Sequence, residues 1–283
     1  MLAGNSNTLN ALDALVLGIV EGLTEYLPIS STGHLLIAGR ALHLSSSGSA
    51  GEAIKSYEIA IQFGAILAVL VLYRQRIRQM IEGLAGRDRD GRRLVTAVAI
   101  AFVPSAIVGV ITEKVVKDAL FGTWPVVVAW MAGGIAILAL SRSQRFTPSG
   151  RSLDTLGLRE GGLIGVAQVI ALWPGTSRSL VTIVAALLLG LSMSAALEFS
   201  FLLGLVTLSA ATAHEILTSG QRMIDHFGIV VPLFGALVAF VAAALSIRWL
   251  VGYLARHDLA IFGWYRIFIA VMTIVLVATG TIS

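Results

Sequence analysis

Two polar motifs interrupt a chain that is otherwise strongly apolar. The first runs from Glu21 to His34 and places carboxylates, hydroxyls and an imidazole within one short segment. Glu21 and Glu25 are four residues apart, so a helix carries both on one face. Pro28 breaks that helix, and the free N–H groups at the start of a following helix favour an anion. The candidate caps of this second helix are Ser30, Ser31 and Thr32.

The second motif, which begins at Pro174, starts another short helix with the sequence Pro-Gly-Thr-Ser-Arg-Ser. Gly175 permits a tight turn with close backbone approach, and Thr176 or Ser177 can cap the helix. Arg178 falls in the first turn, where the helix dipole disfavours a cation. This placement is favourable if an anion lies between the two, because the guanidinium fork matches phosphate oxygens.

Arg178 has a second interpretation, an ion pair with Glu21 or Glu25. Both arrangements can hold in turn, with the carboxylate bound when substrate is absent. If the two motifs meet, the carboxylates repel phosphate unless they hold a divalent cation such as Mg²⁺. This combination fits phosphoryl transfer, in which positioning and charge stabilisation do most of the catalysis. The candidate phosphate ligands are Ser30, Thr32, Ser177, Arg178, Ser179 and Thr182, with Gln62 at the rim.

The composition indicates an integral membrane protein. Of 283 residues, 57% are hydrophobic and 13% are charged, whereas a soluble domain has about 25% charged residues. Several apolar runs approach the ~20 residues that a spanning helix needs. The chain has no cysteine, which excludes disulfides, thiolate metal sites and cysteine nucleophiles.

The chain repeats its own plan weakly, which predicts an all-α integral membrane fold with an inverted-topology repeat. The segment from Leu27 aligns with that from Trp173, Gly18 aligns with Gly165, and Val103-Pro104 aligns with Val231-Pro232. Each half is expected to contain two short helices and three long ones. The short pairs, at 9–27 with 30–43 and 158–173 with 176–190, are predicted to be re-entrant hairpins, because non-helical backbone at membrane depth must face a cavity or protein.

We therefore predict one membrane domain over residues 1–283, with six spanning helices and two re-entrant helical hairpins. The first repeat covers about 9–142 and the second about 158–282. The loops near 74–93, 142–160 and 248–260 carry most of the lysines and arginines, so this side is predicted to be cytoplasmic and both termini to lie outside. This distribution favours membrane anchoring over nucleic-acid binding, despite a net charge of +4.

Together the two motifs resemble the undecaprenyl-diphosphate phosphatase family, the bacitracin-resistance type of bacterial membrane phosphatase. The resemblance covers nearly the whole chain and shows no departure within either motif. It implies that a C55 isoprenyl diphosphate loses its terminal phosphate in the inner membrane, which recycles the lipid carrier of cell-wall synthesis. The predicted topology makes the site face the periplasm. The resemblance also implies a divalent-metal requirement, with Mg²⁺ or Ca²⁺ as the cofactor. The functional positions it implies are Glu21, Glu25, Ser31, His34 and Arg178.

Within this resemblance, Glu21 and Glu25 are the expected metal ligands, and one of them is also a candidate base. Ser31 is the leading nucleophile candidate, activated by Glu25 or His34, while helix capping is its structural alternative. His34 can instead protonate the leaving group, and direct attack by metal-bound water needs no serine step. A lone arginine early in the last helix, Arg266, receives no chemical role.

A second class of function also fits the pattern, namely a secondary transporter or lipid flippase for an anionic substrate. Inverted repeats with broken helices suit transport as well as hydrolysis. The combination of hydroxyl, base and carboxylate pair favours the hydrolase. The expected partners are a polyprenyl diphosphate and membrane lipids, without nucleic acid, and the oligomeric state stays open, a homodimer included.

Overall fold

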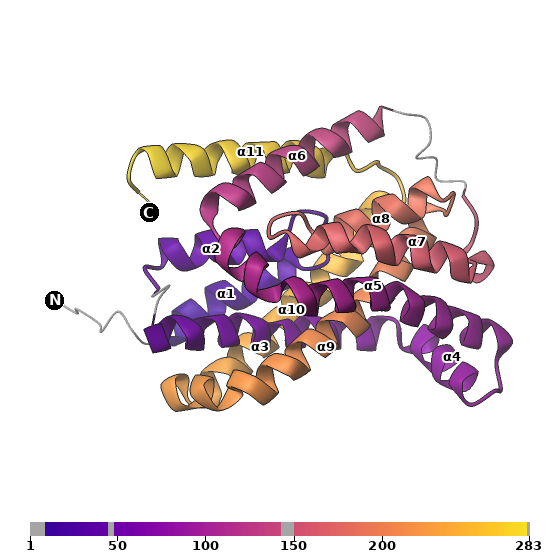
Figure 1. Ribbon diagram of the computed structural model, residues 1–283, viewed down its shortest axis with the longest axis horizontal. Helices are drawn as coiled ribbons and strands as arrows, with labels where there is room; N and C mark the ends of the chain where they lie inside the picture. The colour runs from indigo at the N-terminus through magenta and orange to yellow at the C-terminus, as the bar shows by residue number, and fades with distance from the viewer. Residues whose placement is uncertain (1–8, 45–47, 143–149, 282–283) are drawn as a thin grey trace.

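The computed structural model describes residues 9–44, 48–142 and 150–281, which fold into helices joined by short connections (Figure 1). An isolated β-bridge links Arg151 to Leu191. The α-helices are α1 (Ala11–Thr24), α2 (Ser31–Ala41), α3 (Gly48–Leu72), α4 (Arg74–Leu84), α5 (Arg89–Ala119), α6 (Thr123–Ser141), α7 (Leu158–Gln168), α8 (Arg178–Leu188), α9 (Met193–Phe227), α10 (Val230–Leu254) and α11 (Ala260–Ala278), and the short 3₁₀ helices are η1 (Leu153–Thr155) and η2 (Val169–Leu172).

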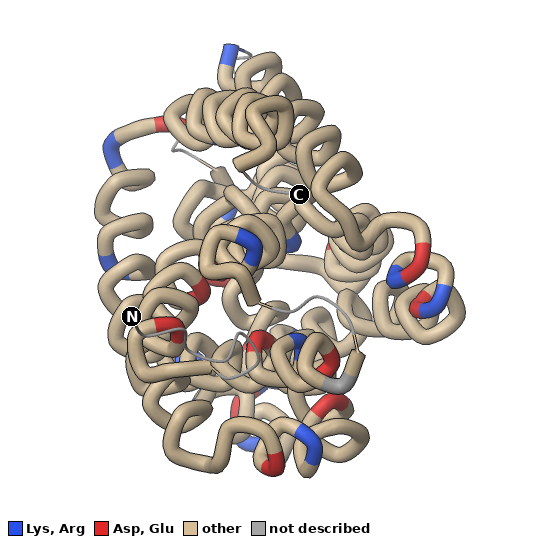
Figure 2. Tube along the Cα trace, turned by 90° about the vertical axis from the view of Figure 1, so that its left-hand side faces the viewer, with Lys and Arg blue, Asp and Glu red and all other residues tan. Residues whose placement is uncertain are grey.

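Six of these helices are long and apolar enough to cross a membrane: α3, α5, α6, α9, α10 and α11. Large apolar side chains point outward from them, including Val110 at 78% and Leu217 at 86% exposure. Most of the chain trace carries no charge (Figure 2). An apolar exterior of this kind is stable in lipid, so the predicted class of multi-pass membrane protein is confirmed.

The order of helices also agrees with the prediction, with one addition. Two short helices precede three long ones in each half of the chain, but α4 occupies most of the segment 74–93 that was expected to be a loop. The ion pair of Arg78 with Glu82, one helical turn apart at 2.8 Å, supports α4 locally. Its sequence is too polar to register as a membrane segment, which is why the apolar pattern misses it.

Helix pairs from the two halves pack reciprocally. The helix α1 of the first half lies against α10 of the second half, and α7 of the second half lies against α5 of the first half. Both contacts use small residues: a Cβ on Gly22 would overlap the carbonyl of Ala239, and a Cβ on Gly165 would overlap that of Ala101. Small residues let helix backbones approach closely. This reciprocity is what a two-fold relation between the halves would produce, while the division into inverted repeats stays a prediction.

One of the predicted correspondences does not hold. Pro104 lies in the middle of α5, whereas Pro232 lies in the first turn of α10. A proline in a first turn leaves helical hydrogen bonding intact, but one in the interior removes a bond. The two prolines therefore occupy different positions within their helices.

The turns of the two short pairs meet in the middle of the molecule. In Figure 1, the connection from α1 to α2 and the connection from η2 to α8 lie near the centre, while α6 and α11 run side by side along one edge. The hydroxyl of Ser179 donates to the carbonyl of Leu27 at 2.9 Å, which links the turns directly. Re-entry of these hairpins into a bilayer stays a prediction.

The predicted topology depends partly on residues outside those that the structure describes. Residues 143–149 of the predicted 142–160 loop lie outside the described residues, as do residues 1–8 and 282–283 at the termini. The side of the membrane on which the termini lie therefore stays a prediction.

Candidate active site

Of the three candidate caps after Pro28, the structure uses Ser30. Its backbone is left-handed, with φ 73°, and its hydroxyl accepts from the N–H of Gly33 at 3.5 Å. A serine with positive φ is strained, and such strain is retained where surrounding contacts hold the turn. Ser31 then becomes the first residue of α2, so its hydroxyl is not needed as a cap.

The second turn has the same geometry. Ser177 adopts φ 76°, and its hydroxyl accepts from the N–H of Leu180 at 3.2 Å, which makes it the cap of α8. Gly175 adopts φ 93° and packs against the backbone of Val126, where a Cβ would overlap. Ser30 and Ser177 are therefore structural equivalents. The sequence alignment that paired Pro28 with Pro174 was therefore wrong by one residue in this turn. The alignment that paired Gly18 with Gly165 is correct here, because the two glycines are as far apart in the chain as the two caps.

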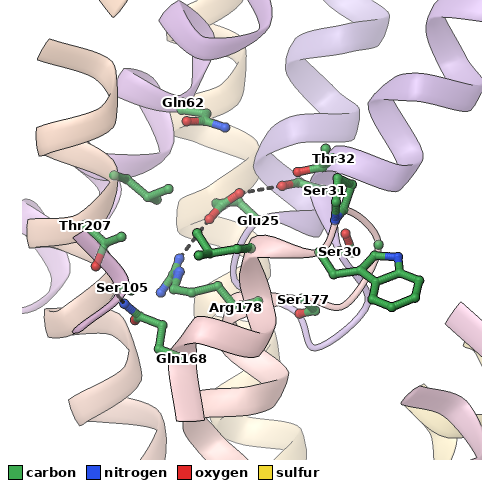
Figure 3. Close-up of a pocket in the computed structure, with 16 residues that line it drawn as sticks. Glu25, Ser30, Ser31, Thr32, Gln62, Ser105, Gln168, Ser177, Arg178 and Thr207 are labelled. Atoms are coloured by element: carbon green, nitrogen blue, oxygen red, sulfur yellow. Dashed lines mark hydrogen bonds and ion pairs between the residues drawn. The ribbon is translucent and has the colours of Figure 1, made fainter. Parts of the chain in front are cut away.

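Glu25 joins the two turns. Its Oε2 accepts a hydrogen bond from the hydroxyl of Ser31 at 2.5 Å, and its Oε1 accepts from Nη2 of Arg178 at 2.8 Å (Figure 3). The Glu25 and Arg178 side chains are 6% and 12% exposed. Arg178 also donates to the carbonyl of Ser200 at 3.0 Å. The alternative in which Arg178 pairs with a carboxylate is thus realised, and the partner is Glu25.

These groups line a cavity of about 190 Å³ between the two hairpins. The cavity brings together a carboxylate, a guanidinium, several hydroxyls and two helix N-termini (Figure 3). Helix N-termini and a guanidinium both favour an oxyanion. The predicted site residues that line it are Glu25, Ser30, Ser31, Thr32, Gln62, Ser177 and Arg178.

Four predicted residues do not line this cavity. Ser179 bonds to the Leu27 carbonyl, and the hydroxyl of Thr182 meets that of Ser200 at 2.7 Å. Both side chains therefore hold backbone and neighbouring helices together, and neither reaches the cavity. Glu21 is fully buried. The fourth residue is His34.

His34 does not line the cavity, contrary to its prediction as a cavity acid or base. Its Nδ1 lies 2.7 Å from the carbonyl of Ser30 and its Nε2 lies 2.9 Å from the hydroxyl of Tyr265. Because a carbonyl only accepts, Nδ1 carries the proton of that bond. The ring lies between Tyr265, which stacks on it, and the edge of Trp130. In this conformation His34 anchors the turn.

The structure adds cavity residues for which the sequence assigned no role. Gln168 donates to the hydroxyl of Ser105, which in turn donates to the carbonyl of Phe102. This chain of bonds leaves Oε1 of Gln168 as a buried acceptor without a partner. Gln168 aligns with Glu21 in the internal repeat, which was the available signal, whereas nothing in the sequence marks Ser105. Thr207 and Trp173 also line the cavity.

The carboxylates provide the test of a metal site. Both oxygens of Glu21 are buried and have no hydrogen-bond partner. An unpaired buried carboxylate is costly, and a cation removes that cost. Within the described residues no group of three or more His, Cys, Asp or Glu side chains is placed to hold a metal. Of the two carboxylates, Glu25 lines the cavity and Glu21 lies one helical turn earlier with both oxygens unpartnered. A cation held by these two side chains would take its remaining ligands from phosphate and water, as Mg²⁺ commonly does.

The fold and the site together define a helical integral membrane protein with a cavity lined by groups that favour an oxyanion. Comparison with known proteins agrees with this class. The family model described as bacitracin resistance protein BacA matches residues 14–272, and the chain belongs to this family.

Curated relatives carry the name undecaprenyl-diphosphatase. One from Sorangium cellulosum strain So ce56 is 44% identical over 258 residues, covering 90% of this chain and 82% of the relative. The undecaprenyl-diphosphatase 1 of Burkholderia lata is 44% identical, covering 90% of this chain and 91% of the relative. A relative from Nitrosomonas europaea is 40% identical and covers 96% of each chain. The residues matched by the family model include both motifs and reach into α11, the last long helix.

Proposed function

We propose that this chain hydrolyses undecaprenyl diphosphate to undecaprenyl phosphate and inorganic phosphate. Membership of the family and the activity for which its relatives are named support this reaction. The observation that carries it to particular residues is Glu25, which contacts a hydroxyl from its own hairpin and a guanidinium from the other. A base, a nucleophile and a phosphate ligand thus meet at one point.

In the proposed reaction, Arg178 exchanges Glu25 for the terminal phosphate, which frees the carboxylate. Glu25 then takes the proton from Ser31, and Oγ forms a bond to the terminal phosphorus. The bond from that phosphorus to the bridging oxygen breaks, and undecaprenyl phosphate leaves with the electron pair. Glu25 passes the proton to the departing phosphate and is a carboxylate again. It then takes a proton from water, whose oxygen bonds to the phosphorus as the bond from phosphorus to Oγ breaks, and Ser31 recovers the proton from Glu25. The N-termini of α2 and α8, with Arg178, stabilise the charge on the transferring group.

The serine step gives a direct prediction. Acid quenching of wild-type protein during turnover is expected to trap phosphate on Ser31, detected by mass spectrometry of the peptide. The Ser31→Ala variant is expected to lose turnover while remaining folded, because Ser30 caps α2. A Ser31→Ala variant with near-wild-type phosphate release would instead favour direct attack by water.

A divalent cation, Mg²⁺ or Ca²⁺, is part of the proposal. Glu21 and Glu25 would hold it together with the diphosphate, and when bound it neutralises charge on the substrate. The unpartnered oxygens of Glu21 support this assignment.

Chelation is therefore expected to abolish phosphate release, and Mg²⁺ or Ca²⁺ to restore it. Glu21→Gln removes one charged ligand, so the cation concentration at half-maximal rate is expected to rise at least about 10-fold. The measurement is a titration of each cation into chelated protein. Full activity in excess chelator would contradict a metal requirement.

The substrate also needs access to the site. A larger cavity of about 630 Å³ shares Thr32 and Gln62 with the first and continues among polar residues that include Lys55 and Arg222. These cations lie on the side predicted to face outward. An apolar groove of about 440 Å³ between α6 and α8 shares Trp173 with the site and suits an isoprenyl chain. The polar cavity supports a site that opens to the periplasm, and the apolar groove supports a substrate with an isoprenyl chain.

Labelling tests this orientation. The chain has no cysteine, so single substitutions give unambiguous signals. In intact spheroplasts an impermeant maleimide is expected to modify Lys114→Cys and to leave Arg87→Cys unmodified until the membrane is permeabilised, because both positions are exposed at opposite ends of α5. The reverse pattern would invert the proposed topology.

The reaction itself is tested with purified protein in detergent, supplied with undecaprenyl diphosphate and Mg²⁺ or Ca²⁺. Release of inorganic phosphate is the readout, and the Glu82→Gln variant, at a half-buried residue outside the cavity, is the control for handling. No release by folded wild-type protein with any cation or isoprenyl length would overturn the proposal. Liposome flux assays would then test the transporter alternative.

A further inference from the structure

Arg266 is a fully buried cation that the proposed reaction does not use. It lies on α11 at 0% exposure, and the described residues provide it with no carboxylate partner. Its guanidinium instead donates to three backbone carbonyls, those of Pro28 at 3.3 Å, Ala129 at 2.8 Å and Gly175 at 2.9 Å. An ionisable group buried in a membrane protein is costly, so a specific role is the default expectation.

Two of these carbonyls are equivalent positions in the two site turns. Pro28 lies two residues before the cap Ser30, and Gly175 lies two residues before the cap Ser177. One guanidinium therefore joins the same backbone position of both turns, through Nη1 on one side and Nη2 on the other. The planar, rigid fork of arginine suits such a bridge, and the single ammonium of lysine does not.

The neighbouring helix leaves space for this group. A Cβ on Gly133 would overlap the guanidinium of Arg266, and a Cβ on Gly134 would lie 2.8 Å from Ile267. The Ala129 carbonyl on the same helix, α6, also accepts from Arg266. The surface of α6 is thus shaped around the bridge.

Other side chains hold the remaining carbonyls of the first turn. The carbonyl of Leu27 accepts from Ser179, that of Ile29 from Trp130 and that of Ser30 from His34. With Arg266 on Pro28, four consecutive carbonyls are bound by side chains, and none of these side chains lines the cavity. The turn is therefore held by side chains that do not line the cavity.

From this arrangement we infer that Arg266 is a positioning residue, which sets the separation of the two site turns and so brings Arg178 into line with Glu25 and Ser31. The inference rests on the proposed function for its kinetic consequence. The reacting groups come from different turns, so their alignment depends on how the turns are joined. A misplacement of about 1 Å can cost a reaction about 100-fold.

The test compares Arg266→Lys with Gly133→Ala, which keeps the arginine but crowds it. Their matched controls are Arg256→Lys, at an exposed arginine, and Gly252→Ala, whose Cβ meets nothing within 4 Å. For each variant we would measure kcat, KM, the melting temperature in detergent, and hydrogen–deuterium exchange of peptides covering both turns.

Both site variants are expected to lose about 100-fold in kcat with little change in KM, and to exchange faster at both turns, while the controls match wild type. Gly133→Ala in the Arg266→Lys background is expected to add no further loss, since both act on one bridge. Wild-type kcat in Arg266→Lys, or a loss explained by a lower folded fraction, would overturn the inference. Exchange is measured without substrate, so unchanged exchange at the turns overturns it even if wild type proves inactive on undecaprenyl diphosphate.

Discussion

Glu25→Gln is expected to reduce phosphate release by at least about 1,000-fold. Glutamine keeps the size of the side chain and a hydrogen bond to Ser31, but it cannot take the Ser31 proton. Positioned general bases contribute about 10²–10⁴-fold, and Glu25 is also a proposed ligand of the cation. The loss is therefore expected in kcat, with binding of the diphosphate headgroup less affected.

The control for this variant comes from another ion pair in the same chain. Arg78 and Glu82 are 2.8 Å apart, the same distance as Arg178 and Glu25, but their side chains are 82% and 39% exposed. Glu82→Gln removes an equivalent carboxylate from a solvated pair and is expected to leave phosphate release unchanged. Activity of Glu25→Gln within about 10-fold of wild type would remove Glu25 from the role of base.

Arg178→Lys is expected to reduce phosphate release by about 1,000-fold. Lysine keeps the charge but loses the planar fork, so it cannot bind Glu25 and the carbonyl of Ser200 as Arg178 does, nor present two donors to a phosphate. Arginines that stabilise a transferring phosphoryl group contribute about 10³–10⁵-fold. The matched control is Arg78→Lys, which should release phosphate at the wild-type rate.

Double substitution can separate the effect of the Glu25–Arg178 ion pair on stability from its effect on catalysis. Removing one partner of a buried ion pair costs about 3–5 kcal/mol, because the other charge is left uncompensated. Arg178→Met alone is thus expected to lower the melting temperature, and the double variant with Glu25→Gln to recover much of it. If the double variant stays inactive despite regained stability, the pair acts in the reaction. Regained activity would show that Arg178 matters only for folding.

The sequence by itself determined the class of the protein, its helix order and the location of its site. Long apolar runs predict spanning helices because lipid requires internally bonded backbone, and the spacing of Glu21 from Glu25 and the caps after Pro28 are local features. These depend on neighbouring residues, so they can be read along the chain. The sequence analysis did not predict the helix α4, because this polar, arginine-rich segment contains no long apolar run.

Only the tertiary structure decided which of the marked residues meet. The left-handed backbone at Ser30 makes this residue the cap of α2, and the hydroxyl of Ser31 is then free to contact Glu25. The sequence offers the two serines as equivalent caps and does not distinguish them. Glu25 and Arg178 are 153 residues apart, and no local pattern tells whether Arg178 will choose Glu21 or Glu25. His34 faces Tyr265 on the last helix for the same reason.

The role of Arg266 is the clearest example of what the sequence alone does not predict. In the sequence it is a lone arginine in an apolar helix, a signal that points to function without naming one. Its role depends on backbone carbonyls at Pro28, Ala129 and Gly175. Every residue carries a carbonyl, so the sequence cannot mark which ones an arginine will bind. The fold alone brings those three within reach of one guanidinium.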